Sequence, residues 1–444
     1  MNIAAQVLLV FGAIGMLLLL MALVRRLAQR ANLGAEVQRK VVHIGTGFFA
    51  MALPWLFPER WPVYVLIAVT LVVMVVLRLP SLSGKLGDVI HGVERRSHGD
   101  FLLAIAIGLC FFLAEGDVLF YILPIAVLTL SDAAAALTGT TYGSRRFKVE
   151  SGHKSVEGSV AFFVVTLLIA LILLMFLSDL PPANILTLAV MMAAFGTLVE
   201  AQSWRGFDNF FLPLGLQVFL IVHSQTSLLD LLGIAALFLF VIVSFRTLGK
   251  RLGYTTHAIR VYVVAMFLIL AVVELQNAIF PALVLLTHVW ATLRHPSRDE
   301  YGDLDIVAAL ALFSFGWLAL GRATGWNAVQ FYGLTSMGIA MGLMAIALKR
   351  QVFWVPVIAG LLYGLRLLIT ELNSLESRWA EPLWFLPALC LALPASAVWL
   401  APAFFNKDRG LKLTLLSLAL PLSYYIFLLL NRSGLTAMMA GGGL

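Results

Sequence analysis

Charged residues are scarce in this sequence. Only 12% of its 444 residues are Asp, Glu, Lys or Arg, whereas 61% are hydrophobic, and the mean hydropathy is +0.98. A soluble globular domain usually carries about 25% charged residues on its water-facing surface. This scarcity excludes an ordinary soluble protein and predicts an integral membrane protein.

Cysteine is nearly absent too. The two cysteines, Cys110 and Cys390, both lie inside apolar segments and are far apart in the chain. A disulfide framework or a cysteine metal site needs more cysteines at closer spacing. We therefore expect both to be packing residues.

Two common nucleotide-binding motifs are also missing. A Walker A loop needs glycine directly before its Lys-Ser pair, but His153 precedes Lys154 here. A Rossmann fingerprint is absent as well. Any nucleotide site must therefore be built in another way.

Long apolar segments are what the sequence has in abundance. Sixteen of them approach the ~20 residues of a helical span, although several are short. We therefore predict an all-α polytopic membrane protein with roughly 14–16 transmembrane helices. The approximate limits of the segments are 4–24, 41–57, 61–79, 101–115, 118–138, 159–178, 184–201, 210–223, 229–245, 259–274, 277–293, 306–320, 327–348, 352–371, 384–402 and 412–430.

The basic residues predict the orientation of these spans. No positive residue precedes the first segment, and Arg25, Arg26 and Arg30 follow it, which is the reverse of a signal peptide. We expect a retained first span with the N-terminus outside. Alternate loops then hold 25 of the 30 Lys and Arg residues, against 4 on the other side. Lys and Arg concentrate in cytoplasmic loops, so the net charge of +7 reflects topology and gives no reason to expect nucleic acid.

One of these predicted cytoplasmic loops belongs to a polar stretch, SDAAAALTGTTYGSRRFKVESGHKSVEGS, which runs from Ser131 to Ser159. Asp132 follows an apolar run and is expected at or just inside the membrane boundary. An acid there is costly and is a functional candidate by default, but it could also be a hydrated residue or a helix cap.

The same stretch contains glycines and a compact polar box. Gly139, Gly143 and Gly158 would let backbone N–H groups approach a polyphosphate, although a flexible basic loop is the plainer interpretation. The box Lys154-Ser155-x-Glu157 is harder to explain in that way. Lysine neutralises phosphate, serine donates a hydrogen bond to it, and glutamate holds Mg²⁺ or orients a nucleophile.

Two further polar clusters accompany it. Arg39, Lys40 and His43 share one helical face that leads into the second span, where membrane anchoring is the alternative explanation for the two cations. The second cluster is a very short cytoplasmic turn with more polar groups than a connector needs: Glu200, Arg205, Asp208 and Asn209.

Together these motifs resemble a known family. The pattern Ser131-Asp132-Ala133, Gly139, Tyr142-Gly143 and Lys154-Ser155-x-Glu157-Gly158-Ser159 resembles the signature of the membrane lipid-alcohol kinases. This family includes dolichol kinase, phytol and farnesol kinase and the CTP-dependent diacylglycerol kinase, in a superfamily shared with phosphatidate cytidylyltransferase. The resemblance covers about residues 30–225 and extends to Glu94-Arg95 and to Trp204-Arg205-Gly206-x-Asp208-Asn209.

The resemblance implies an enzyme that transfers a phosphoryl group from CTP, with Mg²⁺, to phytol, a polyprenol or dolichol, or diacylglycerol. The implied catalytic residues are Asp132, Lys154, Glu157 and Asp208, with Asp132 and Glu157 as metal ligands. The implied nucleotide-binding and phosphate-binding residues are Arg39, Lys40, His43, Gly139, Gly143, Ser155, Gly158, Arg205 and Asn209. Which acid acts as base, and whether the donor is CTP or ATP, stays open.

The second half of the chain lies outside the resemblance. We expect a catalytic domain over 1–228 and an additional transmembrane domain of unknown role over 229–444. Gly-Asp precedes an apolar span in both halves, at Gly99 and Gly302, which fits either a degenerate repeat or chance.

Two other functions remain open. A phosphatidate cytidylyltransferase could use the same box, although its expected His-Gly-Gly…Asp-Arg-x-Asp segment is absent. A lipid transporter or flippase would place polar residues near mid-membrane in both halves. We expect a bacterial inner membrane and an active site on the cytoplasmic side, and homo-oligomerisation is left open.

Overall fold

The structure is a computed structural model of the whole chain. It describes residues 3–31, 35–77, 99–149, 152–202, 206–251, 254, 256–326, 328–349, 351, 353–373 and 383–431. Contacts divide the chain into two compact units, Met1–Phe240 and Val241–Leu444. The predicted functional division at residue 228 is a separate matter and stays a prediction.

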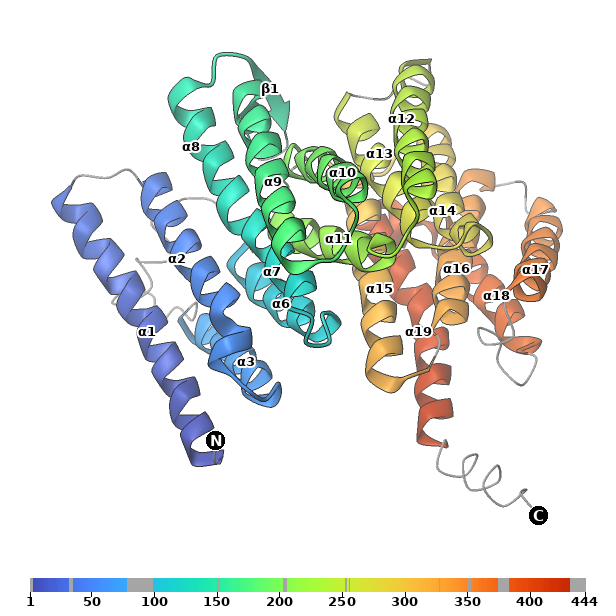
Figure 1. The fold of residues 1–444 in the computed structure, drawn as a ribbon. Coiled ribbons are helices and arrows are strands. Elements are labelled where there is room, and N and C mark those ends of the chain that lie inside the picture. The colour runs from blue at the N-terminus through green and yellow to red at the C-terminus, as the bar shows by residue number, and fades with distance from the viewer. Residues whose placement is uncertain are drawn as a thin grey trace. The chain divides into compact units, whose positions relative to one another are not determined.

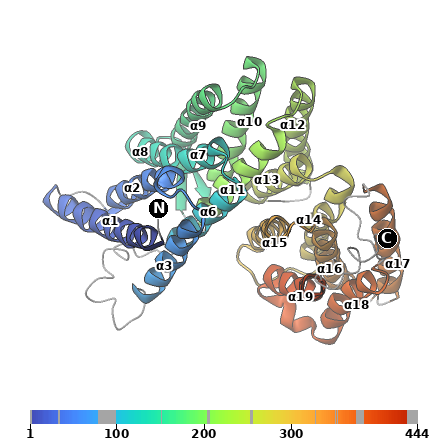
Figure 2. The same ribbon diagram turned by 60° about the horizontal axis from the view of Figure 1, so that its bottom comes forward.

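The first unit is a set of helices with one short hairpin (Figures 1 and 2). Strands β1 and β2 pair antiparallel, with Arg146 opposite Ser155, and connect α8 to α9. The described elements are α1 (Ile3–Arg30), α2 (Ala35–Leu56), α3 (Trp61–Leu77), α6 (Gly99–Leu113), α7 (Val118–Ala126), η2 (Val127–Ser131), α8 (Asp132–Tyr142), β1 (Arg146–Val149), β2 (Gly152–Ser155), α9 (Val156–Leu177), α10 (Pro182–Glu200), α11 (Asp208–His223) and α12 (Leu228–Arg251), whose last turns belong to the second unit.

The second unit continues the helical pattern. Its remaining elements are α13 (Thr256–Val272), α14 (Leu275–Arg294), α15 (Gly302–Thr324), α16 (Val329–Leu348), α17 (Trp354–Leu372), α18 (Phe385–Leu400), the 3₁₀ turn η4 (Pro402–Asn406) and α19 (Arg409–Leu430).

The apolar surface of these helices confirms the membrane prediction. Each of the sixteen predicted segments lies largely on helix, and ten described helices are long and apolar enough to cross a membrane. Five shorter apolar helices accompany them. Helices such as α1, α9 and α17 leave most of their apolar side chains uncovered, and lipid is the solvent that suits such a surface. The chain is therefore an all-α integral membrane protein.

One continuous helix forms the centre of the first unit. It runs from Val118 to Tyr142 as α7, η2 and α8, and most of its side chains are buried. The segment η2 is π-helical, so its backbone hydrogen bonds span five residues instead of the four of an α-helix, and it begins three residues after Pro124. Because π-helical turns often occur at functional sites, η2 directs attention to Asp132, the residue that follows it.

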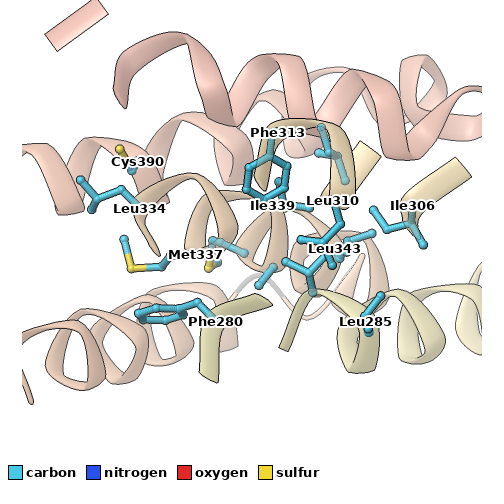
Figure 3. Packing of buried hydrophobic residues seen from close by; sticks show 14 of the residues in the cluster. Phe280, Leu285, Ile306, Leu310, Phe313, Leu334, Met337, Ile339, Leu343 and Cys390 are labelled. Carbon is cyan, nitrogen blue, oxygen red and sulfur yellow. The ribbon is translucent and has the colours of Figure 1, made fainter. Parts of the chain in front are cut away.

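Helix α16 has the same central place in the second unit (Figure 3). Most of its side chains are buried, and it packs against α14, α15, α18 and α19. Figure 3 shows Leu334, Met337, Ile339 and Leu343 of α16 among residues of α14 and α15. Cys390 is part of this cluster and Cys110 is also fully buried, so both cysteines are packing residues, as expected.

Candidate functional site

A close helix contact brings the second span to the central helix. A Cβ atom on Gly47 of α2 would lie 2.1 Å from Oγ1 of Thr129 in η2, so only glycine fits at this distance. The Tyr121 hydroxyl also donates to the Ala50 carbonyl at 2.8 Å. These contacts place the start of α2 beside the start of α8.

Lys40, His43 and Asp132 meet at this contact. Nζ of Lys40 lies 2.5 Å from Oδ2 of Asp132, and Nε2 of His43 lies 3.7 Å from the same oxygen. The His43 ring is also 3.2 Å from the Leu128 carbonyl. The three side chains are 6–13% exposed, so this is a buried ion pair with a histidine beside it. The predicted acid and two of the predicted phosphate-binding residues thus share one site.

Asp132 lies inside one long helix. Helix α8 continues from Asp132 to Tyr142, about 15 Å further along the axis, and the expected depth of Asp132 at the membrane boundary stays a prediction. The run of four alanines after Asp132 has high helix propensity, and the π-helical turn before it keeps the helix continuous. Asp132 is therefore an interior helix residue.

Lys154 forms a second ion pair nearby. Its ammonium group donates to the Glu200 side chain and to the Glu200 backbone carbonyl, which joins β2 to the end of α10. Glu200 is 8% exposed and Lys154 is 20% exposed. The charge of Lys154 also acts on Asp132, together with the charges of Lys40 and His43. The two ion pairs therefore belong to one electrostatic neighbourhood.

The glycines serve helix packing rather than a loop. We expected a glycine-bearing loop, but Gly139 lies inside α8 and Gly158 lies in the first turn of α9. A Cβ atom on Gly158 would lie 2.8 Å from the Ala135 carbonyl oxygen, and one on Gly143 would clash with Ser155. The expectation of a loop at Gly139 and Gly158 is wrong, because these residues let α8 and α9 cross closely.

Ser155 and Glu157 order the start of α9. Oγ of Ser155 accepts a hydrogen bond from the Gly158 N–H at 3.0 Å, which caps the helix. Glu157 is partly exposed and accepts from the Ser144 hydroxyl at 2.5 Å and from the Arg145 N–H at 3.2 Å. Glu157 therefore ties the hairpin to α9 and does not contact the Lys40–Asp132 pair in this arrangement.

The remaining predicted residues lie around this region. Asp208 is the first residue of α11, and the Asn209 amide donates to the Gly99 carbonyl at 3.1 Å, which joins α11 to α6. Arg39 is an exposed residue of α2, one position before Lys40. Arg205, with Trp204 and Glu94-Arg95, lies outside the described residues.

The two acids predicted to hold Mg²⁺ have separate partners, because Asp132 pairs with Lys40 whereas Glu157 accepts from Ser144 and Arg145. Asp132 and Glu157 supply carboxylate oxygens, the ligand type that Mg²⁺ prefers, and Mg²⁺ commonly takes only one or two protein carboxylates besides phosphate. Among the described residues, no three His, Cys, Asp or Glu side chains form a group that could hold a metal by itself. A metal here would therefore need the phosphates of a nucleotide as further ligands.

Sequence reasoning did not choose Glu200 as a site residue. It noted Glu200 as one of four polar groups in a short turn, and an acid at the end of an apolar helix was the available signal. Its partner could not be read from the sequence, because Lys154 and Glu200 are 46 residues apart. The π-helical turn had no sequence signal that we used.

Comparison with known proteins finds a similar kinase. The chain is 32% identical over 185 residues to a phytol kinase from Synechocystis sp., which is 41% of this chain and 76% of that kinase. No protein-family model and no solved structure matches the chain.

Proposed function

Because the chain belongs to the phytol kinase family, we propose that it phosphorylates a membrane lipid alcohol with a nucleoside triphosphate, and that the donor is CTP. The observation that carries this proposal is the buried set of Lys40, His43 and Asp132 beside Lys154 and Glu200. Phytol is the first alcohol to test, followed by polyprenols, dolichol and diacylglycerol.

The geometry supports phosphoryl transfer because that reaction depends mainly on positioning and charge neutralisation. Lys40 and Lys154 are two cations held close to Asp132, and each could turn to a phosphate oxygen when a nucleotide enters. We propose that the Asp132 carboxylate accepts the proton of the lipid hydroxyl.

The expected cofactor is Mg²⁺, which would neutralise charge on the triphosphate when bound. We propose that Asp132 and Glu157 hold it. Asp208, the first residue of α11, is the third acid that we propose for the reaction. Ser155, with the helix N-terminus that it caps, is proposed to donate hydrogen bonds to phosphate. Arg39 and Asn209 are proposed to bind the nucleotide.

The site is proposed to face the cytoplasm, where nucleoside triphosphates are, in a bacterial inner membrane. The basic residues of the hairpin, Arg145, Arg146 and Lys148, support this orientation through the positive-inside rule. The lipid alcohol would then reach the site from the bilayer between the exposed apolar helices.

The position of a radioactive label in CTP tests the reaction type. The purified protein is incubated with Mg²⁺, phytol and CTP labelled at either the γ or the α phosphorus. We expect the γ label alone to appear in the lipid product. If phosphatidate instead takes up the α label with release of pyrophosphate, the protein is a cytidylyltransferase and the kinase proposal fails.

Two variants test the proposed residues. Asp132→Asn and Glu157→Gln should each lower phosphoryl transfer about 100-fold or more if the carboxylates act in the reaction. Glu157 is partly exposed, so its variant tests the site even if the buried Asp132 variant folds poorly. Asp179→Asn, in an exposed turn at the other end of α9, is the matched control with unchanged turnover. Full activity in both site variants would contradict the proposed kinase site and favour the alternative of a lipid transporter.

A further inference from the structure

A cavity in the second unit has a basic end that the proposed kinase reaction does not use. It measures about 270 Å³ and lies where α14, α16 and α18 end and where α17 and α19 begin. The polar residues that line it are His295, Lys349, Ser396, Asn406 and Arg409. The tertiary structure thus gathers three basic side chains from three separate helix ends.

Arg409 is the strongest sign of a ligand. Its residue is only 1% exposed, yet it lines the cavity. Nη2 donates to the His295 carbonyl at 2.8 Å and Nε donates to the Phe405 carbonyl at 3.3 Å, whereas the buried Nη1 has no hydrogen-bond partner among the residues that the structure describes. A buried guanidinium N–H without an acceptor is costly, and an anion in the cavity would satisfy it.

Asp299, an acid near Arg409, is already engaged with the backbone. The Asp299 carboxylate accepts from the N–H of Asp408 at 2.6 Å and from the N–H of Arg409 at 3.3 Å. Asp299 therefore fixes the start of α19 and attracts the guanidinium, but it does not line the cavity. Among the described residues that line the cavity, none is acidic.

The pKa of His295 reflects the positive charges gathered in this region. It follows the last residue of α14, outside the apolar span. Burial, and then the neighbouring cations Lys349, Arg409 and Arg294, lower the pKa of the His295 imidazole. An anion would reduce this repulsion. The N-termini of α17 and α19 add partial positive charge at this end and the C-termini of α14, α16 and α18 add partial negative charge, so the basic side chains and not the helix dipoles favour an anion.

The other walls of the cavity are mainly apolar, and exposed tryptophans lie at this end of the helices. Trp399 lines the cavity and is 64% exposed, and the neighbouring Trp354 at the start of α17 is 51% exposed. Exposed tryptophans on membrane helices concentrate at the level of the lipid headgroups. The remaining wall is built mainly from Ala345, Ile346, Val355, Pro356, Ala395, Val398, Pro402 and Phe405.

We propose that this cavity binds the anionic phosphate headgroup of a membrane lipid, with Arg409 and Lys349 as the phosphate ligands. The basic end matches the phosphate, and the apolar walls match the adjoining acyl or isoprenoid chain. This site is separate from the proposed kinase site and does not depend on it.

Native mass spectrometry of the full-length detergent-solubilised protein tests the proposal, with phosphatidate and phosphatidylcholine as competing probes. We expect at least tenfold preferential retention of phosphatidate by the wild type. Lys349→Gln and Arg409→Gln should abolish this preference, whereas Arg298→Gln, an exposed cation at the same end of α14, should keep it.

Three results would overturn the proposal. These are equal retention of the two lipids, an unchanged preference in Lys349→Gln, and displacement of phosphatidate by inorganic phosphate at equal concentration. The last result would assign the cavity to free phosphate. Lys349 is exposed, so its variant stays informative if Arg409→Gln does not fold, and its lipid-alcohol phosphorylation should remain at the wild-type level.

Discussion

At the scale of single residues, four charged side chains of the first unit form two ion pairs. Lys40 with Asp132 and Lys154 with Glu200 are partly or fully removed from solvent, which would be unfavourable for any of the four alone. Paired in this way, they keep polar groups inside an apolar helix bundle. If a nucleotide draws Lys40 or Lys154 away, the carboxylate that this lysine leaves needs another positive charge, which Mg²⁺ bound with the nucleotide would supply.

Removal of one member of the Lys40–Asp132 pair should destabilise the protein. We expect Lys40→Met to cost about 3–5 kcal/mol, because an uncompensated buried carboxylate remains. Thermal unfolding in one detergent measures this effect. The double variant Lys40→Met/Asp132→Asn should recover part of the loss. If the loss in the double variant instead equals the sum of the two single losses, the two side chains are not coupled.

The Lys154–Glu200 pair leads to a prediction about activity. Lys154→Gln should reduce phosphoryl transfer at least tenfold, because the triphosphate loses a positioned cation. Lys148→Gln changes an exposed lysine of the same hairpin and should leave turnover unchanged. Steady-state rates with phytol and CTP compare the two, and similar rates for both variants would remove Lys154 from the proposed site.

At the scale of elements, close helix contacts position the side chains. Gly47 allows α2 to approach η2, and Gly139 and Gly158 allow α8 to approach α9. The hairpin β1–β2 then bridges α8 and α9 at one end, where Ser155 caps α9. The polar box thus has a defined position although it lies between two apolar helices.

A methyl group at the α8–α9 crossing should disturb this arrangement. Gly158→Ala would place a Cβ atom 2.8 Å from the Ala135 carbonyl oxygen, and we expect a loss of about 1–3 kcal/mol from overpacking. Gly15→Ala on α1 has nothing within 4 Å of the new Cβ atom and should be neutral or slightly stabilising. Thermal unfolding measures the stability of both variants, and equal stabilities would contradict the close α8–α9 contact at Gly158.

At the scale of the whole molecule, both units are built from apolar helices, and the sequence predicts that the basic residues concentrate in alternate loops. The described structure has ten helices that are long enough to span a membrane, and five shorter ones. The positive-inside rule predicts that the β1–β2 hairpin is cytoplasmic and that the turn after α9 is outside.

Cysteine labelling tests this orientation. Both native cysteines are buried, so a single engineered cysteine can be detected by an impermeant maleimide. Asp179→Cys should be labelled in intact cells, whereas Lys148→Cys should be labelled only in inverted membrane vesicles. The reverse pattern would place the hairpin outside and would contradict a cytoplasmic kinase site.

The sequence by itself determined the membrane class, the helical spans and the polar stretches that deserve attention. Local composition is enough for these, because a span needs only a continuous apolar run and an intramembrane acid is costly anywhere. Lys154, Asp132 and Lys40 were chosen on this basis, and the resemblance added their proposed roles.

Only the tertiary structure decided which charges meet. Lys40 and Asp132 are 92 residues apart, and Lys154 and Glu200 are 46 apart, so no local pattern could pair them. The π-helical turn, the helix contacts at Gly47 and Gly158 and the basic cavity around Arg409 likewise arise from packing between distant segments. Such contacts depend on how helices cross, which depends on three-dimensional packing and not on the composition of one segment.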